Sequence, residues 1–121
     1  MSALATPQIA PKHVVCVSWV PILAETREML LREAGCQVTS IVGAEQIEKL
    51  HRLPQADLLV LAHSVPRTEK QRVLEIFQAS CKAPILSLLA PHQQKLLQVD
   101  FAVEATNPAD FMRVVREILA V

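Results

Sequence analysis

The sequence predicts a three-layer α/β sandwich, with helices on both faces of a five-stranded parallel sheet. Short apolar runs rich in β-branched residues alternate along the chain with longer amphipathic segments, the order expected of strands joined by crossover helices. Such crossovers are right-handed and make the strands they join parallel. With 121 residues and 51% hydrophobic content, the chain can form one sizeable core, which fits a single domain.

A continuous apolar run followed by helical spacing indicates the first strand and the first helix. Val14–Val17 is apolar throughout, as in a strand buried on both faces. Residues 22–34 form the expected helix, and Gly35 ends it. The apolar positions expected on the inner side of this helix are Ile22, Leu23, Met29 and Leu30.

The next three elements repeat the alternation of strand and helix. Residues 38–42 predict a second strand, and residues 57–62 predict a third. Between them, residues 44–53 predict a helix with Ile47 and Leu50 facing inward.

The second half of the chain adds a helix over 68–81, strands over 84–89 and 101–103, and a last helix. Asn107 can cap the last helix, and Pro108 suits its first position. The inward residues expected are Val73, Leu74, Ile76 and Phe77 in the earlier helix and Phe111, Val114, Val115, Ile118 and Leu119 in the last.

These elements favour the flavodoxin-like strand order 2-1-3-4-5. In this order the carboxyl ends of strands 1 and 3 flank the switch point where ligands usually bind. The residues at those ends are Ser18 and Trp19 after the first strand, and Ala62 and His63 after the third. We therefore expect any functional pocket to lie beside these four residues.

Three local patterns run through the expected strands. They are Val-x-x-Val-x-x-x-Pro at 14–21, Asp-Leu-Leu-Val-Leu-x-x-x-x-Pro at 57–66 and Ala-Pro-Ile-Leu-Ser-Leu-Leu-Ala at 83–90. In this order and at this spacing, the chain resembles the CheY-like receiver domains of two-component response regulators. The resemblance implies a receiver-like domain over 12–121, preceded by a flexible lead-in over 1–11.

The resemblance also shows which residues stand where receivers keep their phosphorylation site. The acidic pair that holds the metal corresponds to Ser18 and Trp19, and the phosphoacceptor aspartate corresponds to Ala62. Leu89 stands at the Thr or Ser position, and Glu104 stands at the lysine position. Aspartyl phosphate requires a carboxylate nucleophile, a metal held by oxygen ligands and groups that neutralise the phosphoryl oxygens. We therefore expect no phosphorylation, no bound metal, no cofactor and no catalytic residue.

The sequence favours a pseudo-receiver, a phosphorylation-independent protein interaction module in two-component signalling. Its expected partner is a signalling kinase, a phosphotransfer protein or another response regulator, with a homodimer as a further possibility. The alternative is a small-ligand or metal-binding sensor that uses a remodelled pocket of Ser18, Trp19, His63 and Glu104. Against this alternative, Trp19 is expected to fill the vacated pocket, and His63 is expected to be an exposed or hydrogen-bonded loop residue. An enzyme is the third hypothesis.

Two faces are candidates for partner binding. One is the first helix with its neighbouring loop, which receivers commonly offer to a kinase or phosphotransfer protein. The other, which we favour from the sequence, combines the shortened fourth-helix segment 91–98 with the last helix. Shortening should expose apolar groups there, and exposed apolar patches often mark contact sites. The residues expected on this second face are Leu96, Leu97, Phe101 and Arg113, although Phe101 is also expected to pack as an ordinary core residue.

Composition excludes several other functions. The 12 basic and 12 acidic residues give a formal net charge of zero, so no basic surface directs the chain to nucleic acid. No apolar run is long enough to span a membrane, and the start lacks a signal peptide pattern, which favours a cytoplasmic location. The two glycines cannot build a phosphate-binding loop.

The cysteines and the remaining histidines carry no motif. Cys16, Cys36 and Cys81 lack paired spacing, so neither a disulfide nor a metal site is expected. The other three histidines are expected at the surface. They are His13, His51 and His92.

Overall fold

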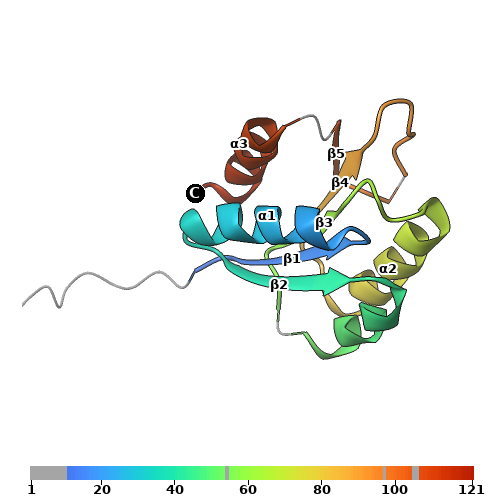
Figure 1. Ribbon diagram of the computed structural model, residues 1–121. Helices are drawn as coiled ribbons and strands as arrows, with labels where there is room; N and C mark the ends of the chain where they lie inside the picture. The colour runs from blue at the N-terminus through green and yellow to red at the C-terminus, as the bar shows by residue number, and fades with distance from the viewer. Residues whose placement is uncertain (1–10, 54, 97, 105–106) are drawn as a thin grey trace, which may run out of the picture.

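The computed structural model describes residues 11–53, 55–96, 98–104 and 107–121, so all but Pro11 of the predicted lead-in lies outside the described residues. Five strands form one sheet in the order β2-β1-β3-β4-β5, and each neighbouring pair is parallel. The predicted fold class and strand order are confirmed (Figure 1). The elements in chain order are β1 His13–Ser18, α1 Pro21–Glu33, β2 Gln37–Val42, η2 Ala44–Arg52, β3 Leu58–Leu61, α2 Arg67–Ser80, β4 Ile85–Leu89, β5 Phe101–Glu104 and α3 Pro108–Leu119.

The central strands are buried on both faces, and each face has its own core. Alternate residues of β1, β3 and β4 point to opposite sides of the sheet. One set packs with η2 and α2, and the other set packs with α1 and α3 (Figure 1). The inward residues predicted for the helix over 68–81 and for the last helix all lie in or against these two cores.

Helix α1 is rotated relative to the prediction: of the four residues predicted to face inward, Leu23 and Leu30 are partly buried, and Ile22 and Met29 are exposed. Ala24 and Leu31 are its buried residues, whereas Ile22 is 65% exposed and Met29 is 56% exposed. At about 100° per residue, a position two residues earlier lies on the opposite side of a helix. Ala24 and Leu31 therefore lie on the side of the helix that packs inward, and Ile22 and Met29 lie on its outward side.

The second helix is a 3₁₀ helix, η2, where an α-helix was expected. Ile47 and Leu50 are buried as predicted, and Leu53 packs against the same core. A 3₁₀ helix has three residues per turn, so residues 47, 50 and 53 share one side. This spacing of apolar residues explains why the tighter helix suits the segment.

No helix is present between β4 and β5 within described residues 90–96 and 98–100. A turn at Pro91 and His92 leads into an irregular stretch, in which His92 has a left-handed φ of 71°. Gln93 stabilises the turn, because its side-chain oxygen accepts a hydrogen bond of 2.8 Å from the Ala90 amide. The sequence predicted that this helix would be short, and in the described part of the segment it is absent altogether.

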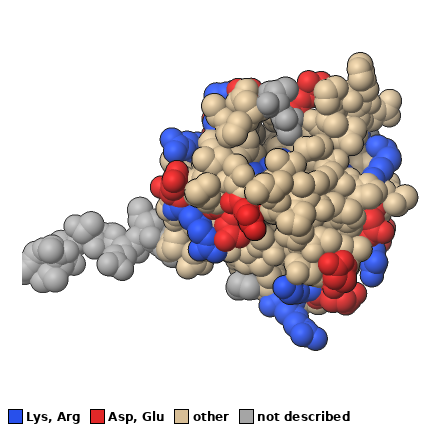
Figure 2. Space-filling model, viewed as in Figure 1, with Lys and Arg blue, Asp and Glu red and all other residues tan. Residues whose placement is uncertain are grey.

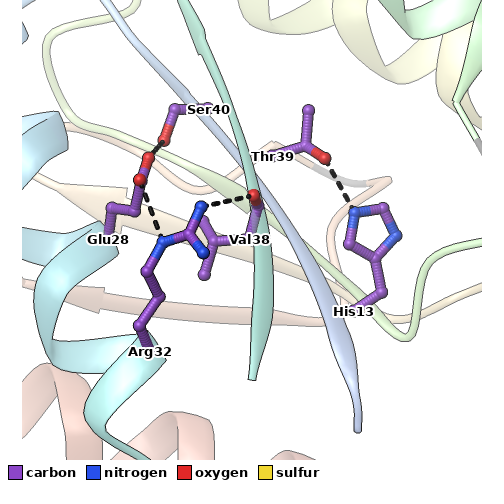
Figure 3. A network of polar contacts seen from close by, with 6 residues as sticks. All are labelled: His13, Glu28, Arg32, Val38, Thr39 and Ser40. Carbon is purple, nitrogen blue, oxygen red and sulfur yellow. Dashed lines mark hydrogen bonds and ion pairs between the residues drawn. The ribbon is translucent and has the colours of Figure 1, made fainter. Parts of the chain in front are cut away.

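Polar contacts tie α1 to strand β2 at the edge of the sheet (Figure 3). The Glu28 carboxylate accepts a hydrogen bond of 2.7 Å from the Ser40 hydroxyl and one of 3.0 Å from Arg32 Nε. Arg32 also donates to the Val38 carbonyl at 3.4 Å. The Ser40 hydrogen bond is the main reason why the pKa of Glu28 lies below its ordinary value. These contacts fix the orientation of α1.

His13 is buried, contrary to the surface location expected from the sequence. Its Nδ1 lies 3.2 Å from the Gln55 carbonyl oxygen, and its Nε2 lies 2.8 Å from the Thr39 hydroxyl (Figure 3). A carbonyl can only accept, so Nδ1 donates to Gln55, and the Thr39 hydroxyl can pair with Nε2 as either donor or acceptor. Both polar atoms are thus satisfied, which permits burial.

Candidate functional site

A pair of hydroxyl groups closes the carboxyl end of β1, where a metal-binding acidic pair was sought. Ser18 is buried, and its Oγ lies 3.3 Å from Ser64 Oγ. Ser18 Oγ also accepts a hydrogen bond of 3.2 Å from the Val20 amide, and Ser64 Oγ accepts one of 3.0 Å from the Trp19 amide. These oxygens are neutral and already bonded, so they are poor ligands for Mg²⁺.

Ala62 lies at the centre of an apolar region. It is 1% exposed and belongs to the core on the α2 side of the sheet, against which Trp19 also packs. Its amide donates to the Val17 carbonyl at 2.9 Å. A methyl group in this environment provides neither a nucleophile nor space for a hydrated ion.

The two remaining phosphorylation-site positions are neighbours in the sheet. Leu89 of β4 and Glu104 of β5 are partners in the parallel register. Leu89 is partly buried, whereas the Glu104 side chain is exposed. Neither supplies a hydroxyl or a cation toward Ala62.

Lys70 is a buried cation that the sequence analysis did not single out. It is 4% exposed, and its Nζ donates to Ser87 Oγ at 3.0 Å and to the Leu88 carbonyl at 3.2 Å. Burial, with a smaller contribution from Arg67, lowers the pKa of Lys70. Its burial could have been predicted from its spacing in the sequence. Lys70 lies three residues before Val73 and seven before Phe77, which places it on the same inward side of α2.

His63 does not share a pocket with Ser18, Trp19 and Glu104. It is partly buried and lines a cavity between α1 and α3 together with Arg27. Its Nδ1 is buried without a hydrogen-bond partner, so the exposed or hydrogen-bonded loop histidine predicted from the sequence is wrong. Burial, and then the charges of Arg27 and Lys70, lower the pKa of His63.

The arrangement of titratable groups does not resemble a metal centre. Within the described residues, no three His, Cys, Asp or Glu side chains lie close enough together to hold a metal ion. Cys16, Cys36 and Cys81 are free thiols, and burial raises the pKa of Cys16 to about 12. Among the described helices, none is long and apolar enough to cross a membrane.

The interaction face predicted around residues 91–98 is only partly present. Leu96 is 3% exposed and belongs to the core, so its predicted exposure is wrong. Leu96 and Val99 instead belong to the core on the α2 side of the sheet, where burial of their apolar side chains is favourable. Leu97 lies outside the described residues. Phe101 is 42% exposed, so its expected packing role is wrong as well, and Arg113 lies on the surface between Asp110 and Glu117.

No protein-family model and no curated protein matches the sequence. Solved structures do match its fold. A CheY-like response regulator receiver domain from Methylobacillus flagellatus aligns with a TM-score of 0.71 at 15% identity, covering 89% of this chain and 98% of the other. The fold is that of a CheY-like receiver domain.

Two further receiver structures show the same fold with ligands bound. The Thermotoga maritima response regulator TrrA, solved with Mg²⁺ and beryllofluoride, has a TM-score of 0.68 at 20% identity, covering 88% of this chain and 98% of its own. A Burkholderia pseudomallei response regulator with a phosphorylated aspartic acid has a TM-score of 0.62 at 11% identity, covering 90% of this chain and 71% of its own. Within this receiver fold, the present chain has Ala62 where the sequence resemblance places the phosphoacceptor.

Proposed function

We propose that this receiver-like domain is a phosphorylation-independent interaction module that binds another two-component signalling protein in the cytoplasm. The observation that carries the proposal is the state of the phosphorylation site. Ala62 is buried among apolar side chains, and Ser18 and Trp19 stand at the positions of the acidic pair, with the Ser18 hydroxyl 3.3 Å from the Ser64 hydroxyl. The proposal assigns no catalytic residue.

Electrostatics support the absence of a magnesium site. The buried Lys70 amino group reaches the carboxyl half of β4, and Arg27 lies beside His63. Receivers balance their lysine with the acidic pair that holds the metal, whereas this chain has Ser18 and Trp19 at those positions, so no acidic pair offsets these cations. The domain therefore lacks the chemical signal that switches a receiver between two states.

A domain without this switch should present its binding face constantly. Helix α1 offers such a face, since Ile22 and Met29 lie seven residues apart on its outward side and are both exposed. The contacts of Glu28 and Arg32 with β2 hold this helix in place. Figure 2 shows the side of the molecule where α1 lies, with much of its surface uncharged and charged side chains of both signs distributed around it.

We therefore propose α1, and not segment 91–98, as the interaction face. The burial of Leu96 removes the reason for favouring that segment. The preferred partner is a signalling kinase or a phosphotransfer protein, with another response regulator next. For the sensor alternative, His63 lines the cavity between α1 and α3, and Ser18, Trp19 and Glu104 do not line that cavity, so we do not pursue it in that form.

Affinity capture from the native cell tests the proposal, with partners identified by mass spectrometry. The wild-type domain should capture a two-component protein, and Ile22→Ser with Met29→Ser should reduce capture at least tenfold, because exposed anchors of an interface carry most of its binding energy. Phe101→Ser is the matched control, since it removes an exposed apolar side chain from β5. Loss of capture with Phe101→Ser and not with the α1 variant contradicts the choice of face, and capture of no two-component protein contradicts the function.

A further inference from the structure

A cavity of about 180 Å³ lies between α1 and α3, beside the carboxyl ends of β3 and β4. It is distinct from the position of Ala62, which is buried in the core on the other face of the sheet. Figure 2 shows this side of the molecule, with the surface hollowed between the two helices and a basic side chain visible in the hollow. The apolar residues that line the cavity are Leu23, Leu30, Leu88, Pro108 and Phe111.

Two polar groups in this cavity have no partner. Arg27 Nη1 and His63 Nδ1 are both buried without a hydrogen bond. Among the described side chains, no carboxylate forms an ion pair with Arg27. Arg27 is partly buried, and a buried guanidinium nitrogen such as its Nη1 has lost water without gaining a hydrogen bond, which is costly.

The other polar side chains that line the cavity, Thr26 and Asn107, already form hydrogen bonds within the protein. The Thr26 hydroxyl donates to the Ile22 carbonyl at 3.0 Å. The Asn107 side-chain oxygen accepts from the Asp110 amide at 2.8 Å, and its nitrogen donates to the Asp110 carboxylate at 2.9 Å. Arg27 and His63 are therefore the two groups left to meet a ligand, and a guanidinium pairs best with a planar oxyanion.

We propose that this cavity binds a small carboxylate with an apolar body about the size of an aromatic ring. The carboxylate pairs with Arg27 and accepts a hydrogen bond from His63, and the ring lies against the leucines and Phe111. A cavity of about 150 Å³ lined by apolar side chains is large enough for benzene, so the volume here suits such a ring. The site goes beyond the interaction function and does not depend on it.

Binding should depend on pH through His63. The charged groups that act on its ring are Arg27 from α1 and Lys70 from α2, while β4 and α3 contribute Leu88 and Phe111, which carry no charge. Both cations and burial favour the neutral ring in the empty protein. A bound carboxylate offsets these effects, so binding takes up a proton and becomes tighter as pH falls through the region where the bound His63 titrates.

Calorimetric titration of the full chain with benzoate, up to about 10 mM, tests the site over the range of weak small-ligand affinities. We expect one saturable site that binds more tightly at pH 6 than at pH 7.5, because a carboxylate bound beside His63 favours its protonated ring. Arg27→Met, which keeps an apolar stem, should weaken binding at least tenfold. His63→Asn should remove the pH dependence. Arg113→Met is the matched control, because Arg113 lies on the exposed side of α3.

Two reference compounds and one further variant keep the test decisive. Benzyl alcohol should bind at least tenfold more weakly than benzoate, and so should inorganic phosphate. If Arg27→Met does not fold, Leu23→Trp fills the cavity with Arg27 intact and should block binding. The proposal is overturned if benzoate shows no saturable binding, if Arg27→Met binds it like the wild type, or if either reference compound binds equally well.

Discussion

At the scale of single residues, the site is decided by which side chains replace a receiver's charged groups. Ala62 removes the nucleophile, and Ser18 with Ser64 forms a neutral hydroxyl pair. Lys70 introduces a buried cation, held by Ser87 and the Leu88 carbonyl. In the described residues, this end of the sheet therefore carries hydroxyl groups and a buried cation, an arrangement that disfavours a divalent metal unless carboxylates offset the charge.

Lys70→Met tests the cost of this buried cation. The pKa of Lys70 in the folded protein lies below its ordinary value of 10.5, so the unfolded chain binds the extra proton between the two values. Stability contributed by this group therefore rises as pH increases from the folded pKa toward 10.5. Lys70→Met, which keeps the stem, should remain within about 1 kcal/mol of wild type at pH 7 and should lack this rise.

Urea unfolding of both proteins at pH 7 and pH 10 measures the effect. Cys16 also affects stability over this range, because burial raises its pKa to about 12 and so makes the folded protein less stable as pH rises. Both proteins contain Cys16, so this effect cancels in their difference. The difference in pH dependence between wild type and Lys70→Met therefore reports Lys70. Lys82→Met, at an exposed lysine, is the control. Identical pH dependence in wild type and Lys70→Met would refute the account.

At the scale of elements, the local sequence determines where helices are capped and which type of helix forms, and packing determines which side of each helix is buried. Helix α3 begins as predicted, with Asn107 as its cap and Pro108 in its first turn. Segment 44–52 became a 3₁₀ helix, because its apolar residues recur every third position. Strand β5 lies at the edge of the sheet and leaves Phe101 exposed.

Asn107→Ala should destabilise the protein by about 1 kcal/mol, the usual cost of losing a side-chain cap. The cap consists of the hydrogen bond of 2.8 Å that Asn107 accepts from the Asp110 amide. Denaturant unfolding measures the change, and Asn107→Ser should restore most of the loss because serine also caps helices. Equal stability of the alanine variant and the wild type would show that this hydrogen bond contributes nothing.

At the scale of the whole molecule, the chain has the receiver fold with Ala62 where the sequence resemblance places the phosphoacceptor. Two cores hold helices on both faces of the sheet, and the central strands are buried throughout. Nothing in this packing requires the acidic residues of a receiver. The fold therefore persists as a scaffold whose exposed helix α1 and whose cavity between α1 and α3 supply the proposed functions.

Acetyl phosphate with millimolar Mg²⁺ should leave both the intact mass and the thermal midpoint unchanged. Ala62 cannot be phosphorylated, and a ligand that bound only the folded state would raise its stability by mass action. The Thermotoga response regulator, solved with Mg²⁺ and beryllofluoride, is a suitable positive control. Addition of one phosphoryl group to this chain would end the phosphorylation-independent proposal.

The sequence by itself determined the alternation of strands and helices and their parallel order, and it predicts the loss of the phosphorylation site. These follow from periodicity and from residue identity at a few positions, both of which are local properties. Only the tertiary structure decided which side of α1 faces the sheet, that Leu96 is buried, and that His63 meets Arg27 in place of Ser18 and Glu104. The reason is that a side chain's neighbours depend on how distant elements pack together, and an amphipathic segment without strong contrast, such as α1, does not specify its contacts alone.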